Sequence, residues 1–328
     1  MSFVKSEIKK ILVISLSNIG DVILTFPVID ILKHDFPQAK LTVVIGPKAA
    51  GLLLGNPHFE KIEVFDKHQA TKKTVEWVLH LTKENFDLVV DLRNTAIPLV
   101  LKPKYKTSLF IKKNTDLHMK EKHLKRLKSV YPYQSLSPQR FCLHVSGKDK
   151  AFVQKLISDE VGNKEKFIIV APGAANRDKR WTEEGFALLC DQIMKIYHSK
   201  IVFVGDWEDK KVSCRIAEMM EQRAVNFCGR TNLLQLIEIF QSSFLTIVND
   251  SASLHMASYL NIPVLAIFGP TNPKLYGPWG NVHAYIQKNK NCEKCRHPKR
   301  NALHKCMQAI SADDVFSALM TMYPPGLR

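Results

Sequence analysis

Asp21 is the first residue in the chain with the setting of a reactive group. It follows an apolar run at 11–15 and a polar turn at Ser17 and Asn18, and Gly20 stands directly before it. A carboxylate at the end of a buried strand can serve as a general base, and a glycine beside it lets a ligand approach the backbone closely. The alternative is that Asp21 only caps the following helix. No G-x-G-x-x-G follows the strand, so this is not a dinucleotide-binding fingerprint.

The loop that begins at Gly173 and Ala174 is a second candidate. It follows an apolar run and carries Arg177, Lys179 and Arg180 before the next helix. Exposed backbone N–H groups next to a lysine are suited to a diphosphate. The loop lacks the Gly-Lys-Ser/Thr ending of a Walker A motif. The alternative is an ordinary loop in which the three basic side chains are solvated.

A third polar turn follows another apolar run and contains four polar residues in five: Asn249, Asp250, Ser251 and Ser253. Its oxygens are placed to contact sugar hydroxyls and phosphate. His255 comes one helical turn after Ser251. A single histidine in a helix is more often a structural hydrogen-bonding group than a catalyst, and both readings stay open here.

Cysteines form the fourth candidate. Cys292 and Cys295 are separated by two residues, with Cys306 further on and His297 and His304 nearby. Three cysteines and a histidine could hold zinc. The spacing of the second half is too tight for the usual paired zinc knuckles, and reduced thiols in a surface loop are the competing interpretation.

These turns follow predicted strands, and the strands alternate with predicted helices. That order indicates an α/β fold with parallel sheets and right-handed crossovers. The length of 328 residues favours two domains. The expected strands are 11–15, 41–45, 61–65, 88–91, 107–110, 167–171, 201–204, 245–248 and 264–268. The expected helices are 22–35, 72–84, a basic helix within 112–133, 150–161, 182–197, 212–222, 233–242, 255–260 and 312–322.

Charge is distributed unevenly along the chain, which carries a net +16. Residues 1–150 hold 25 lysines and arginines against 14 aspartates and glutamates, a net +11. This half therefore favours an anionic partner, which could be a phosphorylated substrate, a nucleic acid or an anionic membrane surface. No recognition-helix motif, aromatic RNA-binding strand or zinc-finger spacing supports nucleic acid.

Other features bear on location. No apolar run approaches the roughly 20 residues that span a bilayer. The first residues lack an apolar segment followed by a cleavage site, so we expect no signal peptide. Four isolated cysteines in apolar or amphipathic segments are typical of reduced thiols in the cytosol.

Taken together, the motifs resemble those of the ADP-heptose:lipopolysaccharide heptosyltransferases, family 9 of the glycosyltransferases. The resemblance covers nearly the whole chain and rests on S-N-I-G-D-V-I-L-T-F-P (17–27), P-G-A-A-N-R-D-K-R-W (172–181), V-N-D-S-A-S-L-H-M-A (248–257), G-P-T-N-P (269–273) and the C-x-x-C…H-K-C-M element (292–307). It implies the GT-B fold, with two Rossmann-like domains facing across a cleft. The implied domains are 1–150 for the acceptor and 151–310 for the nucleotide-sugar, with a C-terminal helix, 311–328, packing back on the first.

The resemblance also implies roles for individual residues. Asp21 is the implied catalytic base, and Lys179 is the implied contact to the donor diphosphate. The other implied donor-binding residues are Gly173, Ala174, Asp250, Ser251, Ala252 and His255. The expected acceptor-binding residues are Ser17, Asn18, Gly20, Lys120 and Lys122.

The implied reaction is inverting transfer of a heptose from ADP-heptose to the inner core of lipopolysaccharide, with no cofactor and no metal. The expected partners are the nucleotide-sugar, the anionic core acceptor and the anionic inner face of the cytoplasmic membrane, which the cytoplasmic enzyme would contact peripherally, and no nucleic acid. A GT-B enzyme that uses another nucleotide sugar on a cell-envelope acceptor is the alternative. A basic nucleic-acid-binding protein is a more distant one.

Overall fold

The computed structural model describes residues 3–109, 116–163, 165–280, 282–288 and 305–326. The chain divides into two compact units between His144 and Val145, close to the expected boundary at 150. The difference arises because α7 (Gly147–Glu160) packs on α10 (Leu233–Ser242) in the second unit. The Gln235 amide of α10 donates a hydrogen bond of 2.9 Å to Asp149.

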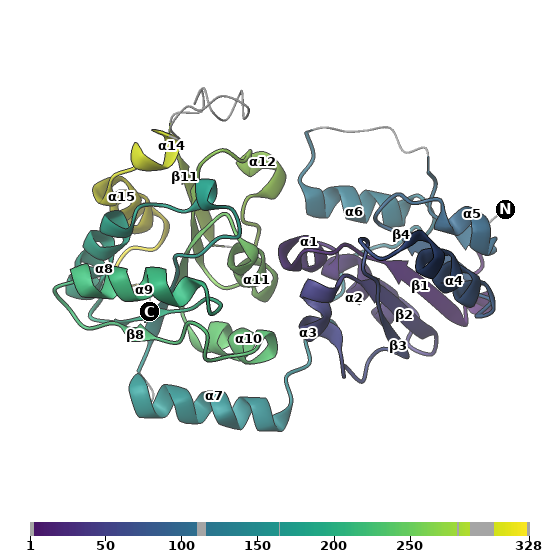
Figure 1. Ribbon diagram of the computed structural model, residues 1–328, viewed down its shortest axis with the longest axis horizontal. Helices are drawn as coiled ribbons and strands as arrows, with labels where there is room; N and C mark the ends of the chain where they lie inside the picture. The colour runs from purple at the N-terminus through teal and green to yellow at the C-terminus, as the bar shows by residue number, and fades with distance from the viewer. Residues whose placement is uncertain (1–2, 110–115, 164, 281, 289–304, 327–328) are drawn as a thin grey trace. The chain divides into compact units, whose positions relative to one another are not determined.

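The first unit contains a parallel five-stranded sheet in the order β3-β2-β1-β4-β5 (Figure 1). Its strands are β1 (Lys10–Ile14), β2 (Lys40–Ile45), β3 (Lys61–Val64), β4 (Leu88–Asp91) and β5 (Tyr105–Lys106). Residues 11–14 of β1 and 88–90 of β4 are apolar and buried, as expected of a parallel sheet covered on both faces. The strand predicted at 107–110 is wrong, because the pairing with β4 is made by Tyr105 and Lys106 just before it; Phe110 lies outside the described residues.

Helices of the first unit are α1 (Ile19–Ile23), α2 (Phe26–Asp35), α3 (Ala50–Leu53), α4 (Thr71–Thr82), α5 (Ile97–Leu101) and α6 (Met119–Lys128), with short 3₁₀ turns η1 (Lys5–Glu7) and η2 (Pro47–Ala49). The single helix predicted at 22–35 is therefore two. Pro27 has no N–H to continue the ladder from α1, and it occupies the first turn of α2 instead. The Thr25 hydroxyl donates to the Val22 carbonyl at the break.

The second unit contains a parallel six-stranded sheet in the order β11-β10-β9-β6-β7-β8. Its strands are β6 (Phe167–Ala171), β7 (Lys200–Phe203), β8 (Val225–Asn226), β9 (Leu245–Asn249), β10 (Val264–Phe268) and β11 (His283–Gln287). Strands β6, β9 and β10 are buried throughout. The two edge strands, β8 and β11, were not predicted, because neither contains an uninterrupted apolar run.

Two groups of helices cover the second sheet. One contains α8 (Glu183–Tyr197), α9 (Asp209–Met219) and α15 (Ala312–Met322), and the other contains α7, α10 and α11 (Ala252–Leu260), with the short α12 (Pro273–Tyr276), α14 (Lys305–Gln308) and η3 (Arg177–Lys179) in the connections. Figure 1 shows the two groups on opposite sides of the strands. Both sheets thus confirm the predicted α/β class with doubly wound halves.

The C-terminal helix α15 packs on α8, β10 and β11 of the second unit. The expected contact of this helix with the first domain stays a prediction. Val315 and Leu319 of α15 are fully buried in the core of the second unit. The cap predicted at Ser311 is confirmed, since its hydroxyl accepts from the Asp314 N–H at 3.2 Å in a capping box. The apolar face of α15 is therefore already covered within the second unit.

Among the described residues, no helix is both long and apolar enough to cross a membrane.

Candidate functional site

In each sheet the chain adds strands on one side of its first strand, and then returns to add strands on the other side. In the first unit this switch point is between β1 and β4, and in the second it is between β6 and β9. Connections leaving such a pair diverge, which opens a crevice at the carboxyl ends of the strands where ligands bind in doubly wound folds. Asp21 and its turn follow β1, and the Gly173 and Asp250 loops follow β6 and β9, so these predicted residues lie at the two switch points.

Asp21 lies in the first turn of α1, just after β1. Its carboxylate is partly exposed and accepts a hydrogen bond of 2.9 Å from the Asn18 side-chain amide. Asn18 is the N-cap residue of α1, yet its side chain makes no capping bond. Asp21 is thus held by a side chain of the same turn, with carboxylate surface left for a ligand. Gly20 has helical backbone here and no positive φ, so its usefulness lies in its small size.

The turn that carries Ser17 is fixed by close packing. A Cβ at Gly46 would lie 2.5 Å from the Ser17 Cα, and the Gly46 N–H donates to the Leu16 carbonyl at 3.0 Å. Below the turn, the buried hydroxyls of Ser15 and Thr25 are 2.7 Å apart. Any side chain at Gly46 would push the turn away from β2.

The loop after β4 shares this switch point, and sequence reasoning missed it. Asp91 is fully buried and accepts from the backbone N–H groups of Arg93 (2.8 Å) and Thr95 (2.5 Å). Arg126 of α6 donates to the Asp91 carbonyl at 2.8 Å and to the Asn94 side chain at 3.1 Å. Asn94 has a φ of +63°. An acid that ends a predicted strand was the available signal.

Lys120 and Lys122 lie on α6, whereas Ser17, Asn18 and Asp21 follow β1. Lys120 forms an ion pair of 3.1 Å with Glu121 on the same helix. The residue of α6 that reaches the switch point is Arg126, through its bonds to the β4 loop. A direct role of the two lysines in acceptor binding therefore stays a prediction.

His123, also on α6, is buried with both ring nitrogens lacking a hydrogen-bond partner among the described residues. Burial, together with the nearby charges of Arg126, His118 and Lys122, lowers the pKa of His123 from 6.5 to about 4. The helix is therefore packed around a neutral imidazole.

In the second unit, Gly173 and Ala174 follow β6 and are buried. A Cβ at Gly173 would lie 2.1 Å from the Asp209 carboxylate, so no side chain fits there without displacing Asp209. Arg180 donates from Nε to the Ala174 carbonyl at 2.7 Å. The backbone of this loop is thus clamped from both sides, as required of N–H groups that receive an anion.

Lys179 and Asp250 form an ion pair that joins the two loops of this switch point. Their Nζ and Oδ2 atoms are 2.7 Å apart, and the side chains are 30% and 5% exposed respectively. The lysine was predicted to contact a diphosphate, and the aspartate to contact the nucleotide-sugar. The structure brings the two together, with Asp250 placed to aim the ammonium group.

Asn249, the last residue of β9, locks the same two loops by backbone contacts. Its amide donates to the Pro172 carbonyl at 2.7 Å, and its side-chain oxygen accepts from the Trp181 N–H at 3.1 Å. The sequence placed Asn249 in a polar turn but gave no sign that it spans both ends of the Gly173 loop.

Arg180 corrects the interpretation of this loop as solvated. Its side chain is 23% exposed, and besides Ala174 it approaches the Asp209 carboxylate to 3.7 Å. Burial raises the pKa of Asp209 above its ordinary value, and the charge of Asp206 adds to the effect. Arg177, by contrast, is exposed as expected.

Ser251 and Ala252 begin α11. The Ser251 hydroxyl is buried and has no hydrogen-bond partner among the described residues, and it does not cap the helix. A buried polar atom in this state calls for a partner, which a bound ligand could supply. His255 is 5% exposed and its ring stacks on Trp279 with centroids 5.6 Å apart, which favours the structural interpretation of this histidine.

The cysteine candidate can be followed only in part. Cys292, Cys295, His297 and His304 lie outside the described residues. Cys306 is 1% exposed and belongs to the apolar core of the second unit, beside Met307 and Ile310. Across the described ranges, no cluster of three or more His, Cys, Asp or Glu residues could hold a metal ion.

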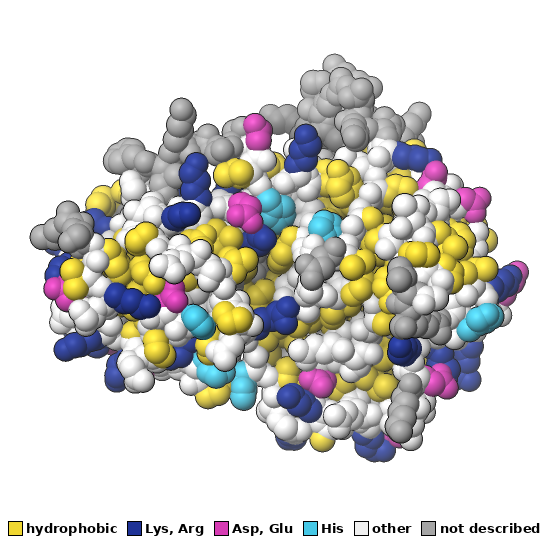
Figure 2. Space-filling model, turned by 180° about the vertical axis from the view of Figure 1, so that it is seen from behind, with side chains coloured by type: hydrophobic (Ala, Val, Ile, Leu, Met, Phe, Trp, Pro, Cys, Tyr) yellow, Lys and Arg dark blue, Asp and Glu magenta, His cyan; other side chains and the backbone are white. Residues whose placement is uncertain are grey.

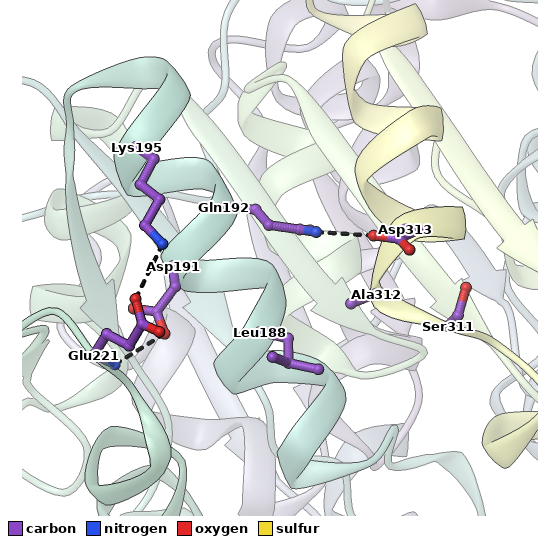
Figure 3. Close-up of a pocket in the computed structure, with 8 residues that line it drawn as sticks. All are labelled: Leu188, Asp191, Gln192, Lys195, Glu221, Ser311, Ala312 and Asp313. Carbon is purple, nitrogen blue, oxygen red and sulfur yellow. Dashed lines mark hydrogen bonds and ion pairs between the residues drawn. The ribbon is translucent and has the colours of Figure 1, made fainter.

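A pocket of about 370 Å³ lies between α8 and the start of α15, away from the strand ends (Figure 3). Its polar groups bind one another. Gln192 donates to Asp313 at 2.8 Å, Lys195 pairs with Glu221 at 3.0 Å, and Asp191 accepts from the Glu221 N–H at 2.9 Å. These contacts tie the helix to its neighbours, so the pocket has a structural explanation.

Comparisons with known proteins agree with the geometry. A sequence model of glycosyltransferase family 9 (heptosyltransferase) matches residues 80–305. The lipopolysaccharide heptosyltransferase 3 of Escherichia coli K12 is 25% identical over 93% of this chain and 95% of its own.

Two solved structures share the fold. One is a family 9 glycosyl transferase from Veillonella parvula, with a TM-score of 0.77 and 23% identity over 96% of this chain and 97% of that one. The other is the E. coli ADP-heptose lipopolysaccharide heptosyltransferase II, with a TM-score of 0.74 and 21% identity over 95% and 98%. The fold is therefore GT-B, and since the family match covers more than half of the residues, the chain belongs to glycosyltransferase family 9, the heptosyltransferases.

Proposed function

We propose that this chain transfers a heptose from ADP-heptose to the inner core of lipopolysaccharide, with inversion at the anomeric carbon and without a metal ion. The observation that carries the proposal is the second unit's switch point. A clamped glycine loop, Lys179 and a Ser251 hydroxyl with no hydrogen-bond partner among the described residues lie there on the loops that follow β6 and β9, where a doubly wound fold has its ligand crevice. Both E. coli proteins named above are lipopolysaccharide heptosyltransferases, and the name of the second includes ADP-heptose.

The leaving diphosphate is the group that this crevice suits. As the bond to the sugar breaks, negative charge grows on the ADP oxygens. Lys179 and the backbone N–H groups at Gly173 and Ala174 would stabilise that charge, so their effect should be greater in the transition state than on the bound donor. Asp250 would hold the lysine in place, and Ser251 would donate its hydroxyl to the diphosphate.

Asp21 is the proposed base on the first unit. It would take the proton from the acceptor hydroxyl as that oxygen attacks the anomeric carbon. Its bond to Asn18 keeps the carboxylate oriented, and Ser17 and Gly20 line the same turn. Lys120 and Lys122, which lie on α6, would attract the anionic lipopolysaccharide core of the acceptor.

The excess of positive charge in residues 1–150 supports a peripheral association with the anionic inner face of the cytoplasmic membrane. Nucleic acid is a poorer partner. On the face seen in Figure 2, lysine and arginine side chains are scattered among acidic and apolar ones and form no single stripe.

The decisive experiment combines donor selectivity with the variant Asp21→Asn. Protection of the wild-type chain against thermal unfolding should be greater with ADP than with UDP or GDP. Asp21→Asn should keep that protection but lower kcat by about 10²-fold or more, the scale of a positioned general base. The matched control is Glu76→Gln, a charge-neutralising change on the exposed face of α4.

Near-wild-type turnover of Asp21→Asn would remove Asp21 from the mechanism. Stronger protection by UDP than by ADP would point to a GT-B enzyme with another donor.

A further inference from the structure

Trp207 has no role in the mechanism above, yet its exposure needs an explanation. It lies in the connection between β7 and α9 and is 70% exposed, more than any other large hydrophobic side chain in the described ranges. An indole presents a large, flat apolar face on which another aromatic ring can stack.

The indole is also held firmly. Gly229, which follows β8, has a φ of +72°, and a Cβ there would lie 2.9 Å from Trp207 Cε3. The ring therefore rests on bare backbone. The Lys210 ammonium lies 4.8 Å from the ring centroid. The loop itself is fixed by Asp206, whose carboxylate accepts from the N–H groups of Glu208 and Asp209 at 2.9 and 3.0 Å.

Trp207 belongs to the same sheet edge as the diphosphate crevice. Strands β6, β7 and β8 are neighbours, and a glycine follows each of them closely: Gly173, Gly205 and Gly229. The Asp209 carboxylate touches both of the first two, at 2.1 Å and 2.7 Å from the positions that their Cβ atoms would take. Two strand spacings separate the first and last glycine, roughly 10 Å. An extended nucleoside diphosphate spans a similar distance from its outer phosphate to its base.

We propose that Trp207 is a stacking platform for the nucleobase of the donor, at the far end of this row of glycines. The inference rests on the proposed function, because it takes the diphosphate to lie at Gly173 and Lys179. A preset indole loses little conformational freedom on binding, and its flat face suits a purine better than a smaller pyrimidine. Trp207 would thereby contribute to the preference for an adenine nucleotide.

Calorimetric titration of the full chain with ADP, UDP and inorganic pyrophosphate tests this. Trp207→Ala should weaken ADP binding by about 5- to 100-fold, the range for one base–aromatic stack. Pyrophosphate affinity should stay within twofold, since that ligand has no base. Trp207→Phe should recover most of the loss. The wild-type preference for ADP over UDP should shrink in Trp207→Ala.

Leu188→Ala is the matched control. Leu188 is 61% exposed on α8 of the same unit, so the variant removes a similarly exposed apolar side chain away from the strand ends. It should leave all three affinities unchanged.

Several outcomes separate the two proposals. Unchanged ADP affinity in Trp207→Ala, with tight binding to the wild type, would overturn the stacking role and leave the proposed function standing. An equal loss of ADP and pyrophosphate binding would show that Trp207 only shapes its loop, which also overturns the inference. A wild-type chain that binds no ADP would contradict the proposed function and, with it, the platform.

Discussion

The ion pair between Lys179 and Asp250 permits a quantitative prediction. At the 2.7 Å between Nζ and Oδ2, Coulomb attraction is about 6 kcal/mol at an effective dielectric constant of 20 and about 1.5 kcal/mol in water. The ammonium is about one-third exposed while the carboxylate is nearly buried. Solvent screening and desolvation therefore reduce the net coupling, which we expect to be about 1–3 kcal/mol.

Single variants should show the asymmetry of this pair. Lys179→Met leaves a buried carboxylate without its cation, and we expect a loss of about 2 kcal/mol in the free energy of unfolding. For a unit of this size that is a fall in Tm of roughly 4–8 °C. Asp250→Asn keeps the shape and leaves the more exposed partner unpaired, so it should cost about 1 kcal/mol or less.

In steady-state kinetics Lys179→Met should again have the larger effect. Lys179→Met removes a charge that acts on the leaving group, and kcat should fall by about 10²- to 10³-fold. Asp250→Asn keeps the lysine but no longer aims it. We expect roughly a tenfold loss in kcat with a small change in KM, which would mark Asp250 as a positioning residue.

The assay is a double-mutant cycle of Lys179→Met and Asp250→Asn, measured by urea unfolding and by steady-state rates. Stability effects that add within about 0.5 kcal/mol would show that the two groups are not coupled. A wild-type kcat for Lys179→Met would refute the assignment of this crevice to the diphosphate.

Three further predictions concern other parts of the chain. Arg180→Ala should weaken ADP binding about tenfold, because it removes the hydrogen bond that holds the Ala174 carbonyl. Arg177 is exposed, so Arg177→Ala should change ADP binding less than twofold. Equal effects of the two variants in a titration would show that Arg180 does not hold the Gly173 loop. The folded-state pKa of His123, about 4, lies below its ordinary 6.5, so the unfolded chain binds the proton first as the pH falls. The free energy of unfolding should therefore be highest above pH 6.5 and fall as the pH is lowered towards 4, by about 2 kcal/mol at pH 5. Urea unfolding of His123→Leu should show a smaller decrease over the same pH range. Turnover should survive EDTA; full loss restored by Mg²⁺ would refute metal independence.

Most of the fold could be predicted because its central strands are short apolar runs that end in polar turns. The bounds of β4, β10, α10 and α15 agree with the predicted ones, since each has a clear period and a clear stop. The edges were harder. Strands β8 and β11 are only half-buried, so their residues lack the apolar pattern that identifies a strand.

The candidate site was predictable in its chemistry but not in its connections. Lys179 and Asp250 stood out as a charged residue in a small-residue loop and an acid at a strand end. Their pairing could not be read from sequence, because it depends on the register that sets β6 beside β9. The sequence did not distinguish Arg180 from Arg177 in the same loop. Only the path of the loop determines that Arg180 contacts Ala174 and Asp209 while Arg177 is exposed.

The covered face of α15 has a consequence for how the protein is made. The first unit ends at residue 144 and holds its own core, so it can fold while the rest of the chain is still being synthesised. The second unit needs Val315 and Leu319 against α8 and β10, and Trp181 Nε1 donates to the Ile310 carbonyl at 2.9 Å. Until these late residues emerge from the ribosome, the loop with Lys179 lacks its support. The nascent second unit should therefore remain protease-sensitive, and dependent on chaperones, for longer than the first.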